Sequence, residues 1–299
     1  MNHNSASAVR SVLETEGLTP KKRWGQNFLI DANVRRRIVS LLEEPGTVWE
    51  IGPGLGSLTE LLIADGFRPT LFELDHGLIR HLRELFADSV AIRPGDALET
   101  LGEALEEDGS PQCIVGNLPY RSASAIIAKI AELVLRPRRM VFMIQTELAD
   151  RLKAPAGSQD YSALTVLVQS HYSVARCFSV GSSAFYPAPR VGSAVVTMEP
   201  VVDYPDMATS RATSSIARLL FGQRRKTCAA ILRQAAKRAS GTTYPSEATG
   251  APNGNGGSGL AGEQIRAAAA TLGYDLTRRA ETFTVAEFLD WGRAAAGRL

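Results

Sequence analysis

The sequence predicts an α/β fold: a mainly parallel sheet of seven strands, one of them antiparallel, covered by helices and followed by a small α-helical domain. Two observations predict it. Through the first two thirds of the chain, short apolar runs alternate with segments of helical spacing, which is the pattern of a parallel sheet built from β-α-β units. After Pro200, sequence of high helix propensity replaces the strand-like runs.

Seven segments have the length and composition of strands, and the first five each precede a helix-like segment. The strands are expected at residues 47–51, 70–74, 89–97 with its exit loop, 113–117, 139–145, 172–180 and 192–200. Helices are expected between them at residues 57–66, 76–86, 103–108, 123–135, 147–152 and 161–172. The last two strands follow each other without a helix, so we expect one of them to run antiparallel.

The C-terminal third is predicted to be helical. Residues 201–210 have the composition of a linker, residues 214–240 that of a helix, and two more helices are expected near 262–272 and 284–296. The Gly/Ser/Asn-rich segment 241–260 is expected to be a flexible loop. We therefore place a first domain at residues 1–204, with a basic segment at 1–30, and a helical domain at 205–299.

Two helix starts carry the pattern of a capping box, in which the side chains of the first and fourth residues each bond the other's backbone N–H. Ser57 with Glu60 predicts the start of the first of the helices between strands. Thr284 with Glu287 predicts the start of the last helix of the chain.

The composition excludes several classes of protein. Hydrophobic residues make up 44% and charged residues 21% of the 299 residues, as in globular domains, and no apolar run approaches the roughly 20 residues of a membrane span. The N-terminus lacks the apolar core of a signal peptide. Three isolated cysteines and four scattered histidines support neither a disulfide framework nor a metal site. We expect a cytoplasmic monomer that binds no metal and no membrane.

Positive charge is concentrated in two blocks, although the formal net charge is only +2. Residues 21–37 contain six basic side chains against Asp31. Residues 207–244 contain no acid and these basic side chains: Arg211, Arg218, Arg224, Arg225, Lys226, Arg233, Lys237 and Arg238. A run of charge is most often the solvated face of a helix, but two blocks beside one domain favour a polyanionic partner.

Glycines and acids follow the first three strands. The segment Glu50-Ile-Gly52-Pro-Gly54-Leu-Gly-Ser can turn tightly and let a ligand approach the backbone. Glu73 ends the next strand, where a carboxylate can hold ribose hydroxyls, and Asp96 ends the third, where it could hold an adenine amino group. The spacing GxGxG, rather than the GxGxxG of NAD-binding proteins, resembles S-adenosylmethionine methyltransferases. A NAD protein and a glycine turn without ligand are the alternatives.

The fourth strand ends in Asn117-Leu118-Pro119-Tyr120, a group suited to hold an adenine amine. That amine is a poor nucleophile because its lone pair is delocalised into the ring, so two acceptors must take its hydrogens. The Asn117 side-chain oxygen and the carbonyl of Leu118 or Pro119 can supply them. The Tyr120 ring offers a face for stacking, worth roughly 1–3 kcal/mol. The base would have to leave its helix. A strand-ending turn with a buried tyrosine is the alternative.

The chain resembles the KsgA (RsmA) family of ribosomal RNA adenine dimethyltransferases. The resemblance covers nearly the whole chain and rests on ordered motifs: KKRWGQNFLID, EIGPGLGSLTELL, FELD, GDAL, GNLPY, AFYPAPRVGSAVV and FGQRRKT. It implies the Rossmann-like fold of class I methyltransferases and S-adenosylmethionine as the donor. One departure is Arg121, which follows the tetrapeptide where the family usually carries Asn.

The resemblance also implies roles for single residues. Asn27 and Leu29 would reach the methionine end of the donor, and Gly52 would belong to the cofactor loop with Gly54 beside it. Glu73 would hold the ribose and Asp96 the adenine amine of the donor. Asn117 would lie at the junction of donor and target. Tyr120 and Phe185 would cover the two faces of the flipped adenine. The C-terminal domain would bind RNA through basic residues, namely Arg224, Arg225, Lys226, Arg233 and Lys237.

The implied substrate is a pair of adjacent adenines in the hairpin near the 3′ end of 16S rRNA, each taking two methyl groups within a pre-30S particle. Three alternatives stay open. The related 23S rRNA dimethylase lacks so extended a basic helical domain. DNA adenine methyltransferases tend to carry a second proline where Leu118 stands. A non-catalytic assembly factor would bind pre-ribosomal RNA without transferring methyl groups.

Overall fold

The computed structural model describes residues 5–20, 26–239, 260 and 262–297. The chain divides into two compact units. The first consists of Met1–Lys153 and Tyr172–Val202, and the second of Ala154–His171 and Asp203–Leu299. Residues 154–171, which the sequence analysis assigned to the first domain, cluster with the second unit because helix α8 (Ala163–Gln169) contacts helix α9 (Met207–Phe221).

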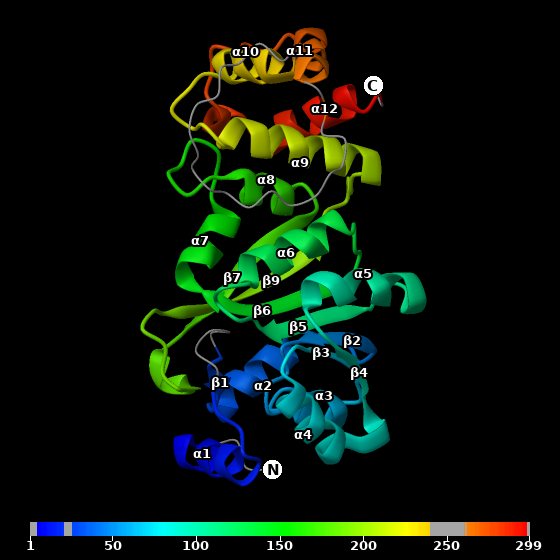
Figure 1. The fold of residues 1–299 in the computed structure, drawn as a ribbon, viewed down its shortest axis with the longest axis vertical. Helices are drawn as coiled ribbons and strands as arrows, with labels where there is room; N and C mark the ends of the chain where they lie inside the picture. Colours follow the sequence, from blue (N-terminus) through cyan, green and yellow to red (C-terminus); the bar gives the residue numbers. More distant parts are fainter. Residues whose placement is uncertain (1–4, 21–25, 240–259, 261, 298–299) are drawn as a thin grey trace. The chain divides into compact units, whose positions relative to one another are not determined.

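The first unit is built on a seven-stranded sheet in the order β4-β3-β2-β5-β6-β9-β7 (Figure 1). Strands β2 (Thr47–Ile51), β3 (Arg68–Glu73), β4 (Ala91–Pro94), β5 (Cys113–Asn117) and β6 (Arg139–Gln145) pair in parallel. Strand β9 (Ser193–Pro200) runs antiparallel to both β6 and β7 (Tyr172–Val180). The predicted mainly parallel sheet with one antiparallel strand is confirmed.

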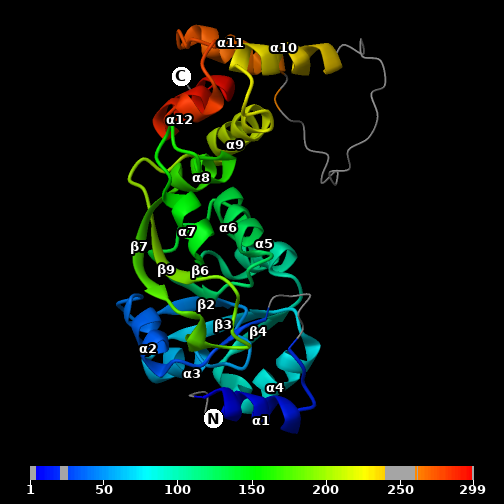
Figure 2. The same ribbon diagram turned by 90° about the vertical axis from the view of Figure 1, so that its left-hand side faces the viewer.

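Helices cover both faces of this sheet (Figures 1 and 2). Helices α2 (Ala32–Ser40), α3 (Thr59–Ala64) and α4 (His76–Phe86) lie on one face, and α5 (Ala97–Asp108) and α6 (Ala123–Glu132) on the other. Helix α7 (Thr146–Lys153) contacts β6, β7 and β9. Apolar side chains of the inner strands are fully buried, as expected for a parallel sheet covered by helices on both faces.

Helices α1 (Ala6–Thr15) and α2 and a small second sheet of the first unit were not predicted. Helix α1 begins at Ser5, whose side chain accepts from the Ala8 N–H. A separate two-stranded antiparallel sheet joins β1 (Phe28–Leu29) to β8 (Phe185–Tyr186). Val9 and Leu13 of α1 pack in one cluster with Phe28 of β1, and Tyr186 of β8 packs against that cluster. The N-terminal segment is thereby fixed beside the glycine turn after β2.

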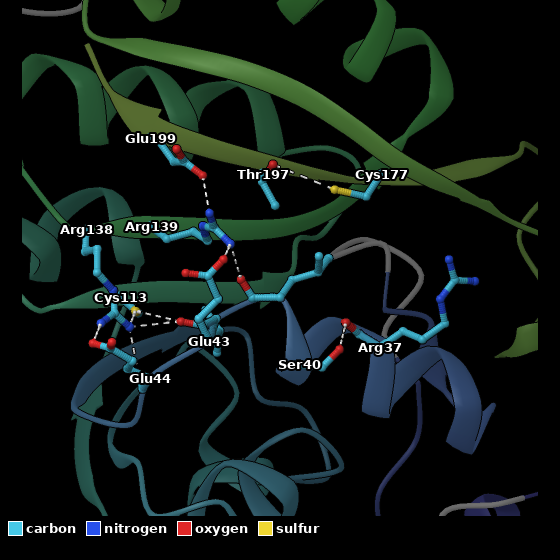
Figure 3. A network of polar contacts seen from close by, with 12 residues as sticks. Arg37, Ser40, Glu43, Glu44, Cys113, Arg138, Arg139, Cys177, Thr197 and Glu199 are labelled. Carbon is cyan, nitrogen blue, oxygen red and sulfur yellow. Dashed lines mark hydrogen bonds and ion pairs between the residues drawn. The ribbon is translucent and has the colours of Figure 1, made fainter. Parts of the chain in front are cut away.

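A polar network fixes the opposite, amino-terminal edge of the sheet (Figure 3). The Arg138 guanidinium binds Glu44 at 2.6 Å and the Leu42 carbonyl at 2.9 Å. Arg139 pairs with Glu43 and, at 2.5 Å, with Glu199 of β9. These contacts tie the turn after α2 to β6 and β9.

The second unit contains α8, α9, α10 (Cys228–Ala239), α11 (Gly262–Thr271) and α12 (Val285–Ala295). Its core is a cluster of aromatic side chains around Trp291, whose ring nitrogen donates to the Ile265 carbonyl at 2.7 Å. Two predictions are wrong here. The last residues of the predicted linker belong to α9, capped by Asp206, and the predicted helix 214–240 is two helices separated by residues 222–227.

The two capping boxes have different outcomes. Thr284 and Glu287 form theirs at the start of α12 as predicted. Ser57 and Glu60 do not: α3 follows Leu58, which has helical dihedral angles and no side-chain cap. The reason is that the Glu60 N–H already donates to the Gly56 carbonyl, so the turn runs into the helix without a break. Of the predicted loop 241–260, residues 241–259 lie outside the described residues.

Candidate active site

A cavity of about 340 Å³ lies where β2, β3 and β5 end, entirely within the first unit. Its volume is within the range of small-molecule sites. Segments that were singled out in the sequence line it: Asn27 and Leu29, the glycine turn, Glu73, Asp96 and residues 117–120. In open α/β sheets, ligands bind at this carboxyl end of the strands.

The glycine turn after β2 has a backbone that other residues rarely adopt. Gly52 and Gly54 have φ values of +70° and +61°. A Cβ on Gly54 would lie 3.2 Å from a ring carbon of Phe28. The two glycines therefore let the turn lie close to β1, and because they have no side chains they do not fill the cavity that they line.

Glu73 ends β3 with its carboxylate fixed by backbone groups. One oxygen accepts from the Leu74 and Asp75 N–H groups, both at 2.9 Å, and the other from the Gly54 N–H at 3.3 Å. Burial raises the pKa of Glu73 to about 7, although these hydrogen bonds lower it. The bond to Gly54 ties the acid to the glycine turn.

Glu50 precedes the glycine turn and lines the same cavity while being 1% exposed. The Thr59 hydroxyl of α3 donates to its carboxylate at 2.6 Å. Burial raises the pKa of Glu50 to about 8, and the negative charge of Glu73 contributes in the same direction. A cationic ligand in the cavity would stabilise the ionised form of both carboxylates.

Asp96 and Leu74 form a more open part of the cavity wall. Asp96 caps α5 by accepting from the Leu98 N–H at 2.9 Å. Leu74, directly after Glu73, is 40% exposed and lines the cavity. An exposed leucine beside a carboxylate suits a flat apolar group with a polar edge. Leu74 was not singled out from the sequence.

Asn117 ends β5 and is tied to the N-terminal segment. Its side-chain Nδ2 donates to the backbone carbonyl of Asn27 at 2.8 Å. Because Nδ2 makes this bond, the amide oxygen Oδ1 remains available as a hydrogen-bond acceptor. Asn117 lines the cavity, so this acceptor belongs to its wall.

The two carbonyls that follow differ in their partners. The Pro119 carbonyl accepts from the Ser122 and Ala123 N–H groups, at 3.0 and 2.9 Å, where α6 begins. The Leu118 carbonyl accepts no hydrogen bond from the part of the chain that the structure describes. The sequence left both as candidates for the second acceptor, and the geometry favours Leu118.

Tyr120 lies half-buried in the cavity wall. Its hydroxyl and that of Ser193, the first residue of β9, are 2.6 Å apart. Burial raises the pKa of the Tyr120 hydroxyl, which therefore stays protonated at neutral pH. This bond fixes one end of the Tyr120 ring. Tyr120 still lines the cavity, so its ring is available for stacking.

Phe185 does not lie where the family resemblance implies. Its side chain is 3% exposed, belongs to the hydrophobic core and is not part of the cavity wall. The pairing of Phe185 with Leu29 in the small sheet explains this position. To cover a base, the Phe185 ring would have to leave that core.

Helices α1 and α4 and the segment before β1 add wall residues that the sequence did not indicate. Val9 of α1 and Leu78 of α4 line the cavity. Gln26 also lines it, and its side chain donates to Asp75 at 3.4 Å. Val9 lies on a short apolar stripe with Val12 and Leu13, which is the one signal that could have identified it.

The predicted RNA-binding residues lie in the second unit. Arg225, Lys226 and Arg233 are exposed, and Lys226 bonds Gln234 at 3.2 Å. Arg224 is half-buried, and its guanidinium donates to the Gln159 carbonyl at 2.8 Å, so it also holds a loop of its own unit. The side chain of Lys237 lies outside the described residues.

Among the described residues, no helix is both long and apolar enough to span a bilayer. Nor do those residues include a group of three or more histidine, cysteine, aspartate or glutamate side chains that could hold a metal ion.

Comparisons with known proteins bear on this site. The family described as Ribosomal RNA adenine dimethylase matches residues 17–248. Ribosomal RNA small subunit methyltransferase A of Treponema denticola is 36% identical over 231 residues, which are 75% of this chain and 79% of the relative. The protein of that name from Aromatoleum aromaticum is 39% identical over 220 residues, 72% of this chain and 81% of the relative.

Solved structures share the fold. A dimethyladenosine transferase from Plasmodium falciparum superposes with a TM-score of 0.64 at 22% identity, covering 88% of this chain and 95% of that one. The 23S rRNA methyltransferase ErmE superposes with a TM-score of 0.56 at 22% identity, covering 90% and 99%.

Proposed function

The chain belongs to the ribosomal RNA adenine dimethylase family, and we propose that it dimethylates N6 of two adjacent adenines in the 3′-terminal hairpin of small-subunit rRNA. The donor in this proposal is S-adenosylmethionine. The observation that carries the proposal is that one cavity joins the carboxylates of Glu50, Glu73 and Asp96 to the segment Asn117–Tyr120.

The acidic part of the cavity fits the donor. Glu73 would accept from the ribose hydroxyls and Asp96 from the adenine amino group, while Gly52 and Gly54 allow close approach of the ligand to the backbone. Asn27 and Leu29 would lie along its methionine end. Two buried carboxylates, Glu50 and Glu73, suit a ligand that carries positive charge. When bound, the donor supplies a methyl group on a cationic sulfur.

The other part of the cavity fits the acceptor. Oδ1 of Asn117 and the carbonyl of Leu118 would accept the two hydrogens of the adenine amine and so direct its lone pair toward the methyl group. In the transfer a new N–C bond would form as the S–C bond of the donor breaks, and the resulting ammonium would lose one proton to water. Catalysis on this account comes from positioning and electrostatics rather than from a dedicated base.

The base must be extruded to reach these acceptors. The Tyr120 ring would then stack on it, and its bond to Ser193 keeps the ring from turning away. We leave Phe185 out of the proposed base contacts because its side chain is buried in the core.

The substrate RNA is proposed to contact the second unit through exposed basic residues, Arg225, Lys226 and Arg233. Exposed Arg and Lys side chains of this kind would contact backbone phosphates rather than read bases. The proposed particle is a pre-30S subunit, on which the protein would act as a monomer in the cytoplasm.

The test is incubation of the protein with methyl-labelled S-adenosylmethionine and small subunits that lack the modification, followed by mapping of the labelled nucleotides. Large-subunit RNA is assayed in parallel. We expect N6,N6-dimethyladenosine at two adjacent positions of the small-subunit RNA alone. Label confined to large-subunit RNA would identify the 23S dimethylase alternative, and RNA binding without label would identify a non-catalytic assembly factor.

A further inference from the structure

Arg121 is the single basic residue among the described residues that line the cavity. It directly follows Tyr120, and Ser122, the next residue, lines the wall as well. Its side chain is exposed, so this part of the wall is open to solvent. The cavity therefore has carboxylates from three strand ends and one guanidinium, on the residue that follows the proposed base-stacking Tyr120.

This charge distribution separates two ligands. The carboxylates of Glu50 and Glu73 complement a cationic donor, which a neighbouring guanidinium would repel. A guanidinium instead prefers an anion with two oxygens in a plane, which a phosphate or a carboxylate supplies. The part of the cavity wall that contains Arg121 is therefore suited to bind an anion.

Two anions could reach Arg121: a phosphodiester of the RNA and the carboxylate of the donor. The RNA is favoured by position and exposure. An extruded nucleotide lies between two phosphodiesters that stay at the mouth of the pocket, and Arg121 is exposed next to the residue on which the base would stack. The donor's amino-acid end is instead assigned to Asn27 and Leu29, on the N-terminal segment.

We propose that Arg121 binds a phosphodiester adjacent to the target adenosine and thereby contributes to RNA affinity from within the catalytic unit. This inference rests on the proposed function, because it requires an RNA substrate. It concerns a position at which the chain departs from the asparagine usual in the resembling proteins. An asparagine could donate a hydrogen bond there but would neutralise no charge.

The experiment compares Arg121→Gln and Arg121→Lys with the wild-type protein. Three quantities are measured: the KM for small-subunit RNA, the dependence of that KM on salt, and the Kd for S-adenosylmethionine. The control is Arg68→Gln, which removes the same charge from an exposed residue at the opposite, amino-terminal end of β3. Melting temperatures verify that each variant is folded.

For Arg121→Gln we expect the RNA KM to rise about tenfold, with the Kd for the donor unchanged. The slope of log KM against log salt should fall by about 0.7–0.9, the value for one lost phosphate contact. Arg121→Lys should restore most of that slope, and Arg68→Gln should match the wild type. A purely structural role of Arg121 would not change the slope.

An unchanged RNA KM and salt slope in Arg121→Gln would overturn the inference while the wild-type protein still methylates small-subunit RNA. A weaker Kd for the donor with an unchanged salt slope would also overturn it, since Arg121 would then bind the donor carboxylate. Absence of methyl transfer by the wild-type protein would instead refute the proposed function itself.

Discussion

The side-chain amide of Asn117 donates a 2.8 Å hydrogen bond to the backbone carbonyl of Asn27, 90 residues earlier in the chain. The bond joins the end of β5 to the segment before β1. In the proposed mechanism it also decides which atom of the amide would accept from the target amine, because Nδ2 is occupied and Oδ1 is left as the acceptor.

Replacing Asn117 should separate catalysis from binding. Asn117→Ala removes one acceptor of the target amine, and losses of about 100- to 1,000-fold in kcat accompany removal of a comparable transition-state hydrogen bond. The Kd for RNA should change little, because the basic residues of the second unit stay in place. Methyl transfer and RNA binding are measured on the same preparation. The control is Asn33→Ala, an exposed asparagine of α2. Full activity of Asn117→Ala would contradict the assignment.

Tyr120 should show separate effects of its ring and its hydroxyl. Tyr120→Ala removes the stacking surface, so the RNA KM should rise by the equivalent of about 1–3 kcal/mol. Tyr120→Phe keeps the ring but leaves the buried Ser193 hydroxyl without this partner, so its free energy of unfolding should fall by about 1–3 kcal/mol. Chemical denaturation should find part of that loss recovered in Tyr120→Phe/Ser193→Ala. An RNA KM raised equally in Tyr120→Phe and Tyr120→Ala would refute stacking.

The sequence was sufficient for elements with strong local signals. Apolar runs bounded by turn residues located the strands of the large sheet, and the acids at their ends all line one cavity. Thr284 and Glu287 predicted a helix start because both partners are local. Motif order predicted the family, which the relatives confirm.

Several of the missed features depend on contacts between distant residues. Strands β1 and β8 are two residues each, and they pair although they are far apart in the sequence. Segments this short have no hydrophobic periodicity from which they could be predicted. The same pairing buries Phe185, whose motif alone could not show whether its ring faces a ligand or the core. The fold likewise determines which carbonyl, that of Leu118 or that of Pro119, accepts hydrogen bonds from the first N–H groups of α6.

Donor affinity should depend on pH. The pKa values of Glu50 and Glu73 are raised to about 8 and about 7, and a cationic donor prefers both groups ionised. Affinity for S-adenosylmethionine should therefore rise from pH 6 to pH 8 by up to about tenfold per pH unit for each group, and level off above. Titration calorimetry in two buffers should find proton release on binding. Glu50→Gln should reduce this dependence to the share of Glu73, whereas Glu106→Gln, an exposed change on α5, should leave it unchanged.

The same pKa shifts predict the opposite trend for stability without ligand. A carboxyl group whose pKa is higher in the folded protein binds its proton more tightly there than in the unfolded chain. The stabilisation is complete below the ordinary value of 4.5 and is lost as the pH rises to about 8. Each group contributes a slope of up to about 1.4 kcal/mol per pH unit. Denaturant titrations from pH 5 to pH 8 measure this slope. If the contribution of these groups to the free energy of unfolding of the ligand-free protein increased with pH, the account would be contradicted.

Gly54→Ala should weaken both the fold and donor binding. An alanine at a φ of +61° costs roughly 1–2 kcal/mol, and its Cβ would press on the Phe28 ring. Gly109→Ala is a matched control, because Gly109 has a φ of +75° but open space around its Cβ position. Both variants should lose stability in thermal unfolding, and only Gly54→Ala should lose affinity for the donor. Equal donor affinity in the two would contradict a role of the turn in binding.

The central claim is that donor and target base meet in one cavity, and a crystal structure with S-adenosylhomocysteine and adenosine monophosphate tests it most directly. We predict ribose hydroxyls on Glu73 and the nucleotide's adenine on the Tyr120 ring. The N6 atom of that adenine should lie about 3 Å from both Asn117 Oδ1 and the Leu118 carbonyl oxygen. A complex in which the donor product occupies the acidic side but protein atoms fill the space beside Tyr120 would contradict the account.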